Sequence, residues 1–168
     1  MNFFKNIMLT LGVLCFTTTA HAEVNPNAEL SVKNARGTPN LVSFLLVEND
    51  NCLINIKVNG QTRWSHGCDT TNLVIFNNNR AMVQLYQGNK LPYALGLDIV
   101  NVNLNNATAT YRVNSIYAAD KKAPATGTCH SNLDTASITC DAKVVDGNDN
   151  LEFYTKTSGG PKHFISNN

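Results

Sequence analysis

Residues 95–114 read LGLDIVNVNLNNATATYRVN, and apolar residues alternate with polar ones on both sides of Asn105-Asn106. Such alternation is typical of a strand with one buried and one solvated face. Asparagine tolerates the positive φ angles that both central residues of a type I′ turn require. The stretch therefore predicts two antiparallel strands joined by a two-residue turn at Asn105-Asn106.

The turn also sets the register of this hairpin. It brings Val102 opposite Ala109 and Val100 opposite Tyr111, with the intervening Asn and Thr residues on the other face. A shift by one residue would mix apolar and polar side chains on both faces. We therefore expect an apolar face that includes all four residues.

Asp98 departs from this pattern, because the same register places it on the apolar face near Val113. A buried carboxylate needs hydrogen-bonding partners. A glycine within a strand often marks a bulge, and a bulge at Gly96 would turn Asp98 outward. We expect the outward orientation, with a buried and hydrogen-bonded Asp98 as the alternative.

Short apolar runs with period two, broken by Asn, Gly, Asp and Thr, recur along the chain, and no stretch has the pattern of a good amphipathic helix. The expected strands span residues 30–33, 41–47, 52–58, 62–66, 73–76, 81–86, 95–104, 107–114, 137–142, 151–156 and 163–165. About ten short strands at this spacing predict one all-β domain with the antiparallel, jelly-roll-like architecture of a β-sandwich. A closed barrel is the alternative.

Strand register also selects a first disulfide. Counting outward from Gly60, within the candidate turn Asn59-Gly60, places Cys52 opposite Cys68, within the range that a cross-strand disulfide spans. This pairing requires either a three-residue loop or a two-residue turn with a bulge at Gly67. We predict a Cys52–Cys68 bond.

A second disulfide follows from the same reasoning. Cys129 and Cys140 are symmetric about a candidate turn at Asp134-Thr135. These four cysteines allow three pairings. The register of the two hairpins favours the pairing in which each disulfide joins the two strands of one hairpin. We predict a Cys129–Cys140 bond.

Residues 1–22 have the parts of a secretory signal peptide: a positive Lys5, an apolar run and a small-x-small site at residues 20–22. Cleavage would remove Cys15 and leave residues 23–168 as a single domain in an oxidising compartment, where disulfides form. We expect a secreted or periplasmic protein with no integral membrane segment after cleavage. The short signal and the Asn-rich composition favour a bacterial source.

Charge argues against one class of partner. The chain has 13 Lys and Arg residues against 12 Asp and Glu, and loss of Lys5 with the signal peptide would leave 12 of each. Nucleic acids and anionic membranes both attract clustered positive charge, yet the only adjacent basic pair is Lys121-Lys122. We expect no nucleic-acid partner.

Asp146, Asn148 and Asn150 place side-chain oxygens at alternate positions of an Asn-rich turn, as a calcium loop does. The stretch lacks the glycine and glutamate that complete an EF-hand, and its composition is also typical of ordinary turns. We expect no cofactor, with calcium at these three residues as the alternative.

Aromatic residues are the other candidates for ligand binding. Tyr86, Tyr93 and Tyr117 lie near the ends of expected strands, where a ring can offer its face to a ligand such as a sugar. Trp64 shares a face with Ile56 and the first disulfide, which predicts a place in the core.

Motifs for catalysis are lacking: the chain has no GxSxG elbow and no HExxH motif, and no cysteine is left free once Cys15 is removed with the signal peptide and the two disulfides form. The sequence therefore favours an exported, non-enzymatic binding or interaction module, such as a bacterial virulence or envelope factor, with a protein or a glycan as its partner. A carbohydrate-binding module and a small secreted hydrolase are the alternatives.

Overall fold

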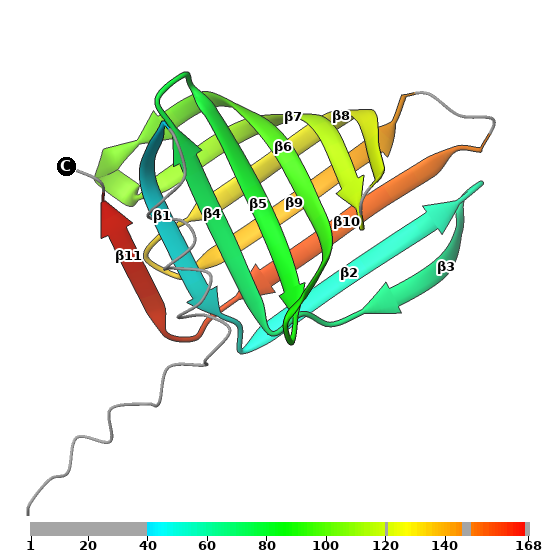
Figure 1. Cartoon of the computed structure of the whole chain (residues 1–168), viewed down its shortest axis with the longest axis horizontal. Helices are drawn as coiled ribbons and strands as arrows, with labels where there is room; N and C mark the ends of the chain where they lie inside the picture. Colours follow the sequence, from blue (N-terminus) through cyan, green and yellow to red (C-terminus); the bar gives the residue numbers. More distant parts are fainter. Residues whose placement is uncertain (1–39, 120, 146–148, 167–168) are drawn as a thin grey trace, which may run out of the picture.

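The computed structural model describes residues 40–119, 121–145 and 149–166. Within them the chain forms eleven strands and one 3₁₀ turn, η1 (Leu104–Asn106) (Figure 1). The strands are β1 (Leu41–Glu48), β2 (Asn51–Val58), β3 (Gln61–His66), β4 (Thr70–Phe76), β5 (Arg80–Gln87), β6 (Lys90–Asn103), β7 (Thr108–Ala118), β8 (Lys121–Asn132), β9 (Ser137–Val144), β10 (Leu151–Ser158) and β11 (Lys162–Ser166). The predicted signal peptide and the strand expected at 30–33 lie outside the described residues.

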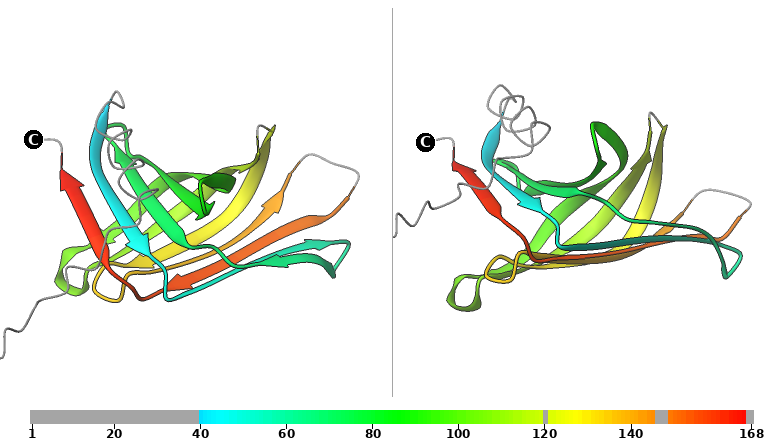
Figure 2. Two further views of the ribbon diagram at one scale, coloured as in Figure 1. Left: turned by 60° about the horizontal axis from the view of Figure 1, so that its bottom comes forward. Right: turned by 90° about the horizontal axis from the view of Figure 1, so that it is seen from below.

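All eleven strands belong to one antiparallel sheet, in the order β11-β1-β4-β5-β6-β7-β8-β9-β10-β2-β3. The sheet is strongly curled into a half-barrel, so that β4 and β5 pass in front of β8 and β9 in Figure 1. Figure 2 shows the same curl from two further directions. The all-β, antiparallel prediction is confirmed. The expected β-sandwich is corrected, because the two facing layers are parts of one continuous sheet.

The strands near the middle of the sheet account for this continuity. β6 is 14 residues long, and its pairing with β7 shifts register twice, between Gly96 and Leu97 and between Ile99 and Asn101. Each bulge bends its strand and increases the local twist. Because these strands are long and bent, the sheet curves while the pairing of neighbouring strands stays continuous. The concave face holds the main core, in which Ile54, Val83, Leu85 and Leu95 are fully buried.

The ends of the sheet meet at a corner. Val47 of β1 lies opposite Lys162 of β11, and Asn51 of β2 lies opposite Ser158 of β10, so one register runs through the bend. β1 and β2 are thus two halves of one bent strand, and so are β10 and β11. Gly160 permits the bend: its φ is +87°, and a Cβ there would overlap the carbonyl oxygen of Glu48.

The apolar run at 41–47 is explained by burial on both faces of β1. Leu45 and Val47 belong to the main core on the concave side. Phe44 and Leu46 belong to a second, smaller apolar cluster with Val74 of β4. A strand that is buried on both faces has a continuous apolar sequence instead of alternating apolar and polar residues.

The β6–β7 hairpin confirms part of the predicted register. Val102 lies opposite Ala109 as predicted, but Val100 is bulged out and Ile99 takes the place opposite Tyr111. The connection is also longer than predicted. It is the 3₁₀ turn η1, with the positive φ of +50° at Ala107 rather than at the two Asn residues.

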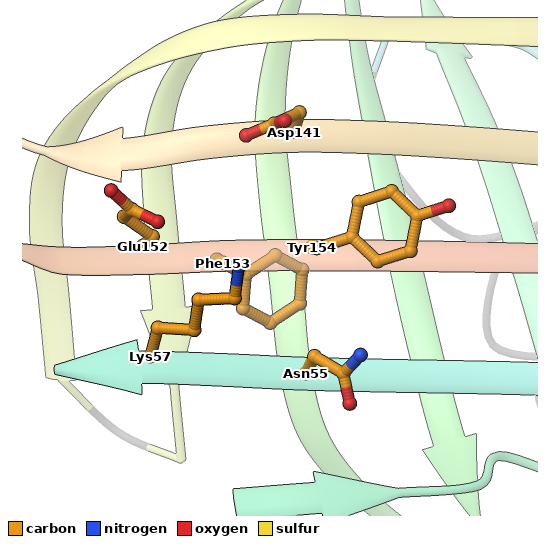
Figure 3. A pocket seen from close by; sticks show the side chains of 6 residues that line it. All are labelled: Asn55, Lys57, Asp141, Glu152, Phe153 and Tyr154. Carbon is orange, nitrogen blue, oxygen red and sulfur yellow. The ribbon is translucent and has the colours of Figure 1, made fainter. Parts of the chain in front are cut away.

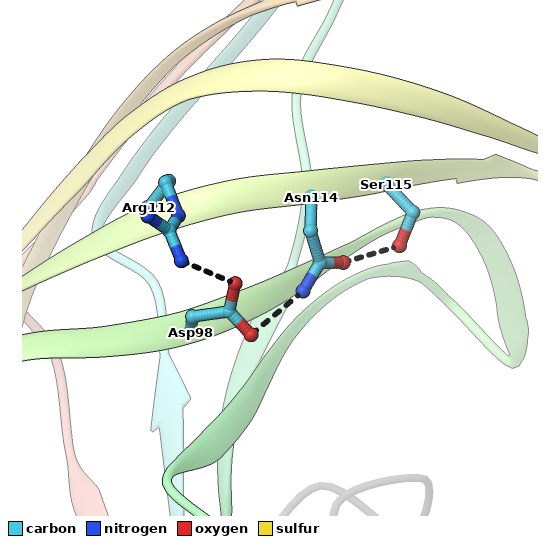
Figure 4. Close-up of polar contacts among 4 residues, drawn as sticks. All are labelled: Asp98, Arg112, Asn114 and Ser115. Atoms are coloured by element: carbon cyan, nitrogen blue, oxygen red, sulfur yellow. Dashed lines mark hydrogen bonds and ion pairs between the residues drawn. The ribbon is translucent and has the colours of Figure 1, made fainter.

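Asp98 points outward, as expected. It lies opposite Arg112, and Figure 4 shows its carboxylate bound by the Arg112 guanidinium at 3.2 Å and the Asn114 amide at 3.1 Å. The register shift opposite Gly96 leaves Asn114 of β7 as the extra residue, so the bulge lies on the partner strand. The bulge at Val100, between Asp98 and the turn, moves Asp98 to the polar face, so the outward orientation is confirmed but its expected cause, a bulge at Gly96, is not.

Both predicted disulfides are present. Cys52–Cys68 and Cys129–Cys140 have Cα–Cα separations of 5.3 Å and 4.1 Å. In the first hairpin the turn is the two-residue Asn59-Gly60, with positive φ at both residues. The compensating bulge lies at Arg63 instead of Gly67, between the pairs Ile56–Trp64 and Lys57–Thr62.

The prediction that Trp64 lies in the core is wrong. Trp64 does lie opposite Ile56, but its side chain is 52% exposed. The reason is topological: β3 forms an edge of the sheet, and all six of its residues are exposed. The register of the β2–β3 hairpin does not show whether a further strand will pair with the other edge of β3.

The sequence pattern does not predict β8 as a strand. Its sequence, KKAPATGTCHSN, contains Pro124 and Gly127, which normally weaken a strand prediction. Its buried residues are small: Ala125, Cys129 and Ser131. β8 owes its place to pairing with β7 and β9 on both sides.

Candidate binding site

An apolar cavity of about 230 Å³ lies on the concave face of the half-barrel, where the β6–β7 hairpin passes β1, β4 and β11. Its apolar lining comes from Leu45, Leu73, Ile75, Val102, Leu104, Ala107, Ala109, Tyr111, Leu133 and Phe164, and Ser43, Asn103 and Thr108 complete it. An apolar cavity of about 150 Å³ can bind benzene, and pockets for drug-sized ligands begin at about 300 Å³. This cavity suits a small apolar ligand or one end of a longer one.

Strand register builds the two walls. On one side Phe164 of β11, Leu45 of β1 and Leu73 of β4 lie in one cross-strand row. On the other side Val102 of β6 lies opposite Ala109 of β7. The small Ala109 leaves room that a larger residue would fill, so the space between the walls stays open.

The mouth of the cavity is lined by apolar side chains that water reaches. Leu104 is 87% exposed, Phe164 65%, Val102 52% and Leu133 40%. Single exposed apolar residues are common, but a group that surrounds one cavity marks an interaction site. These four residues come from the β6–β7 hairpin, the β8–β9 loop and β11.

One polar pair lies at the inner side of the cavity. Tyr111 is 2% exposed, and a hydrogen bond of 3.1 Å joins its hydroxyl to Ser131 Oγ. Burial raises the pKa of Tyr111 above its usual value of 10.0, and the bond to Ser131 offsets part of this effect. The pair keeps a neutral hydroxyl next to the apolar space.

This burial predicts a loss of stability at alkaline pH. The raised pKa means that the folded protein holds the Tyr111 proton more tightly than the unfolded chain does. The contribution of Tyr111 to the free energy of unfolding should be present in full below pH 10 and be lost as the pH rises through the folded-state pKa. In Tyr111→Phe this decline should be shallower, while the unpaired Ser131 hydroxyl costs about 1 kcal/mol at neutral pH. Urea titrations between pH 8 and 11, with the disulfides checked after each, would show it; an equal decline in both proteins would contradict the assignment.

The residues that line the cavity include no Asp, Glu, His, Lys or Arg. Acid–base hydrolysis needs titratable groups that converge on the substrate. The cavity instead offers apolar contact with a few neutral hydrogen-bonding groups, which is the composition of a binding site.

The structure does not gather the three candidate tyrosines into one platform. Tyr93 packs on the concave side against Phe153, with ring centroids 5.5 Å apart, and burial raises its pKa. Tyr117 lies beside Lys122, whose ammonium is 5.4 Å from the ring centroid. Tyr86 is half-buried in β5. Their role in ligand binding stays a prediction.

Two of the three calcium candidates, Asp146 and Asn148, lie outside the described residues. Asn150 is described, and its backbone exchanges hydrogen bonds with Asn59 at the β2–β3 turn. Among the described residues no group of three or more His, Cys, Asp or Glu side chains is placed to hold a metal ion. The same residues include no helix long and apolar enough to cross a membrane.

The sequence predicts part of this site. It groups Val102, Ala109 and Tyr111 on one apolar face, and all three line the cavity. It misses Leu133 and Phe164, because neither has a local pattern that points to the β6–β7 hairpin. Only the curl of the sheet brings them to the same mouth.

Comparison of the chain with protein-family models, with curated protein sequences and with solved structures found no match.

Proposed function

We propose that the protein is an exported, non-enzymatic binding module that takes up an uncharged apolar ligand in the cavity of its half-barrel. The observation that carries the proposal is the cavity itself, with its apolar walls and exposed apolar mouth. Transfer of an apolar ligand from water into such a space is favourable by roughly 25 cal/mol per Å² of apolar surface buried.

The lining also indicates what kind of ligand is preferred. Without a charged group to compensate it, a carboxylate or an ammonium would lose solvation on entry. Asn103 and Thr108 at the lining and the Tyr111–Ser131 pair offer neutral hydrogen bonds to one polar atom. The preferred ligand is therefore neutral, mainly apolar and equipped with at most a hydroxyl or carbonyl group.

Export to the periplasm or the medium of a bacterium is part of this proposal. The two disulfides support it, because such bonds persist in oxidising compartments. There the module would act on a free ligand, or on an envelope or host protein that inserts an apolar side chain into the same mouth. The hydrolase alternative gains no support from a lining without charged groups.

Displacement of a fluorescent apolar probe tests the proposal. We expect 1-aminoanthracene to bind with a dissociation constant of about 10 μM and to be displaced by neutral alcohols such as 1-octanol. Ala109→Phe should fill the cavity and weaken binding by at least about tenfold. Ala118→Phe is the matched control, since Ala118 is an exposed residue of the same strand that does not line the cavity.

Two results would refute this function. One is that the probe and the alcohols do not bind to the oxidised protein. The other is that Ala109→Phe, folded by circular dichroism, binds as tightly as the unmodified protein does.

A further inference from the structure

A shallow hollow of about 280 Å³ lies on the convex face of β9, β10 and β2, away from the apolar cavity. Tyr154 of β10 forms its centre. Strand pairing places Asn55 of β2 on one side of Tyr154 and Asp141 of β9 on the other. An amide and a carboxylate therefore flank the tyrosine ring in one cross-strand row.

A second polar row lies two residues along β10. Glu152 has Lys57 of β2 on one side and Lys143 of β9 on the other. Residues two apart in a strand point to the same side, so this row faces the same hollow. Lys143 Nζ lies 3.1 Å from Glu152 Oε1. The contact orients the carboxylate before any ligand arrives.

Figure 3 shows how these side chains lie. The ring of Tyr154 lies along β10 with one face turned outward, between Asp141 and Asn55. Glu152 and Lys57 stand at one end of the ring. The arrangement combines a flat aromatic surface with hydrogen-bonding groups around its margin.

This combination matches the chemistry of a sugar. One side of a pyranose ring presents C–H groups, which pack against an aromatic face, while its hydroxyls point outward round the edge. Asn55 and Lys57 can donate hydrogen bonds to those hydroxyls, and Asp141 and Glu152 can accept them. Tyr154 would bind the ring, and its neighbours would select the positions of the hydroxyls.

Charge balance narrows the ligand further. The lining has two carboxylates, Asp141 and Glu152, and one ammonium group, Lys57; Lys143, just outside the lining, pairs with Glu152, so the charges around the hollow balance. A phosphate or a polycation would gain little there. We propose that this convex hollow is a binding site for a neutral sugar residue, independent of the apolar cavity.

Titration of the isotopically labelled, oxidised protein with methyl glycosides of glucose, galactose, mannose and N-acetylglucosamine tests this proposal by NMR. At least one sugar should shift the amide signals of Asn55, Asp141 and Tyr154 with a dissociation constant of about 1 mM. Tyr154→Ala should weaken binding by about tenfold, and Tyr154→Phe, which keeps the ring, by less than about threefold.

Three further variants make the outcome specific. Trp64→Ala removes an exposed aromatic ring from β3 that does not line the hollow and should leave the affinity unchanged, as should Ala109→Phe, which blocks only the apolar cavity. Asn55→Ala should weaken binding and serves if Tyr154→Ala does not fold. The proposal is overturned if no sugar gives a saturable shift, or if folded Tyr154→Ala and Asn55→Ala bind like the unmodified protein.

Discussion

Replacement of Phe153 by alanine should lower the free energy of unfolding by about 4 kcal/mol. Phe153 is 1% exposed and lies on the concave face of β10 between Ile56 of β2 and Ala142 of β9. Its ring also contacts Tyr93 of β6, so it connects strands from both facing parts of the curled sheet. Removing it would leave a cavity that the rigid sheet cannot close. Urea unfolding of the oxidised protein, followed by far-ultraviolet circular dichroism, measures the loss.

Phe164→Ala is the matched control. Phe164 is 65% exposed at the mouth of the apolar cavity, and its loss should change the free energy of unfolding by less than about 0.5 kcal/mol. The same variant should weaken binding of the apolar probe, which separates a stabilising aromatic from a ligand-binding one. Similar losses of stability in the two variants would contradict the assignment of Phe153 to the core and of Phe164 to the exposed mouth of the cavity.

Gly160→Ala should destabilise the protein by about 3 kcal/mol. Gly160 adopts a φ of +87°, which L-residues avoid, and a Cβ there would overlap the carbonyl oxygen of Glu48. Relief of the overlap would open the corner between β10 and β11, and would disturb the 3.0 Å hydrogen bond from Glu48 N to Pro161 O. Thermal and urea unfolding both report the effect.

Gly60→Ala separates the two causes. Gly60 has a similar φ of +79°, but a Cβ there would meet nothing within 4 Å. This variant should cost only the backbone strain of about 1 kcal/mol. If both variants lose the same stability, then the corner yields to the extra methyl group and does not constrain the sheet.

The sequence predicted the local features well, for a physical reason. Each predicted disulfide joins cysteines 16 or 11 residues apart, across one hairpin. In such a hairpin the turn residues and the alternation of side chains specify the same register, so two independent local patterns predict each disulfide. The β6–β7 hairpin shows the limit of this logic, since the bulge at Val100 moved the partner of Tyr111 by one residue.

The sequence was less informative wherever distant segments meet. The corner pairs β1 and β2 with β11 and β10, about a hundred residues further along, and no local pattern in either segment points to the other. The exposure of Trp64 and the existence of β8 depend in the same way on which strands happen to be neighbours. Pairing partners decide these features, and local propensity does not.

The sequence alone therefore determined the class of the fold and the hairpin disulfides, because each depends on residues that are close along the chain. Only the tertiary structure decided that one sheet curls on itself instead of two sheets packing together. It likewise brought Leu104, Leu133 and Phe164 to one cavity mouth and set Asn55 and Asp141 beside Tyr154. Those arrangements arise from bulges, twist and long-range strand pairing, whose effects add up over the whole sheet.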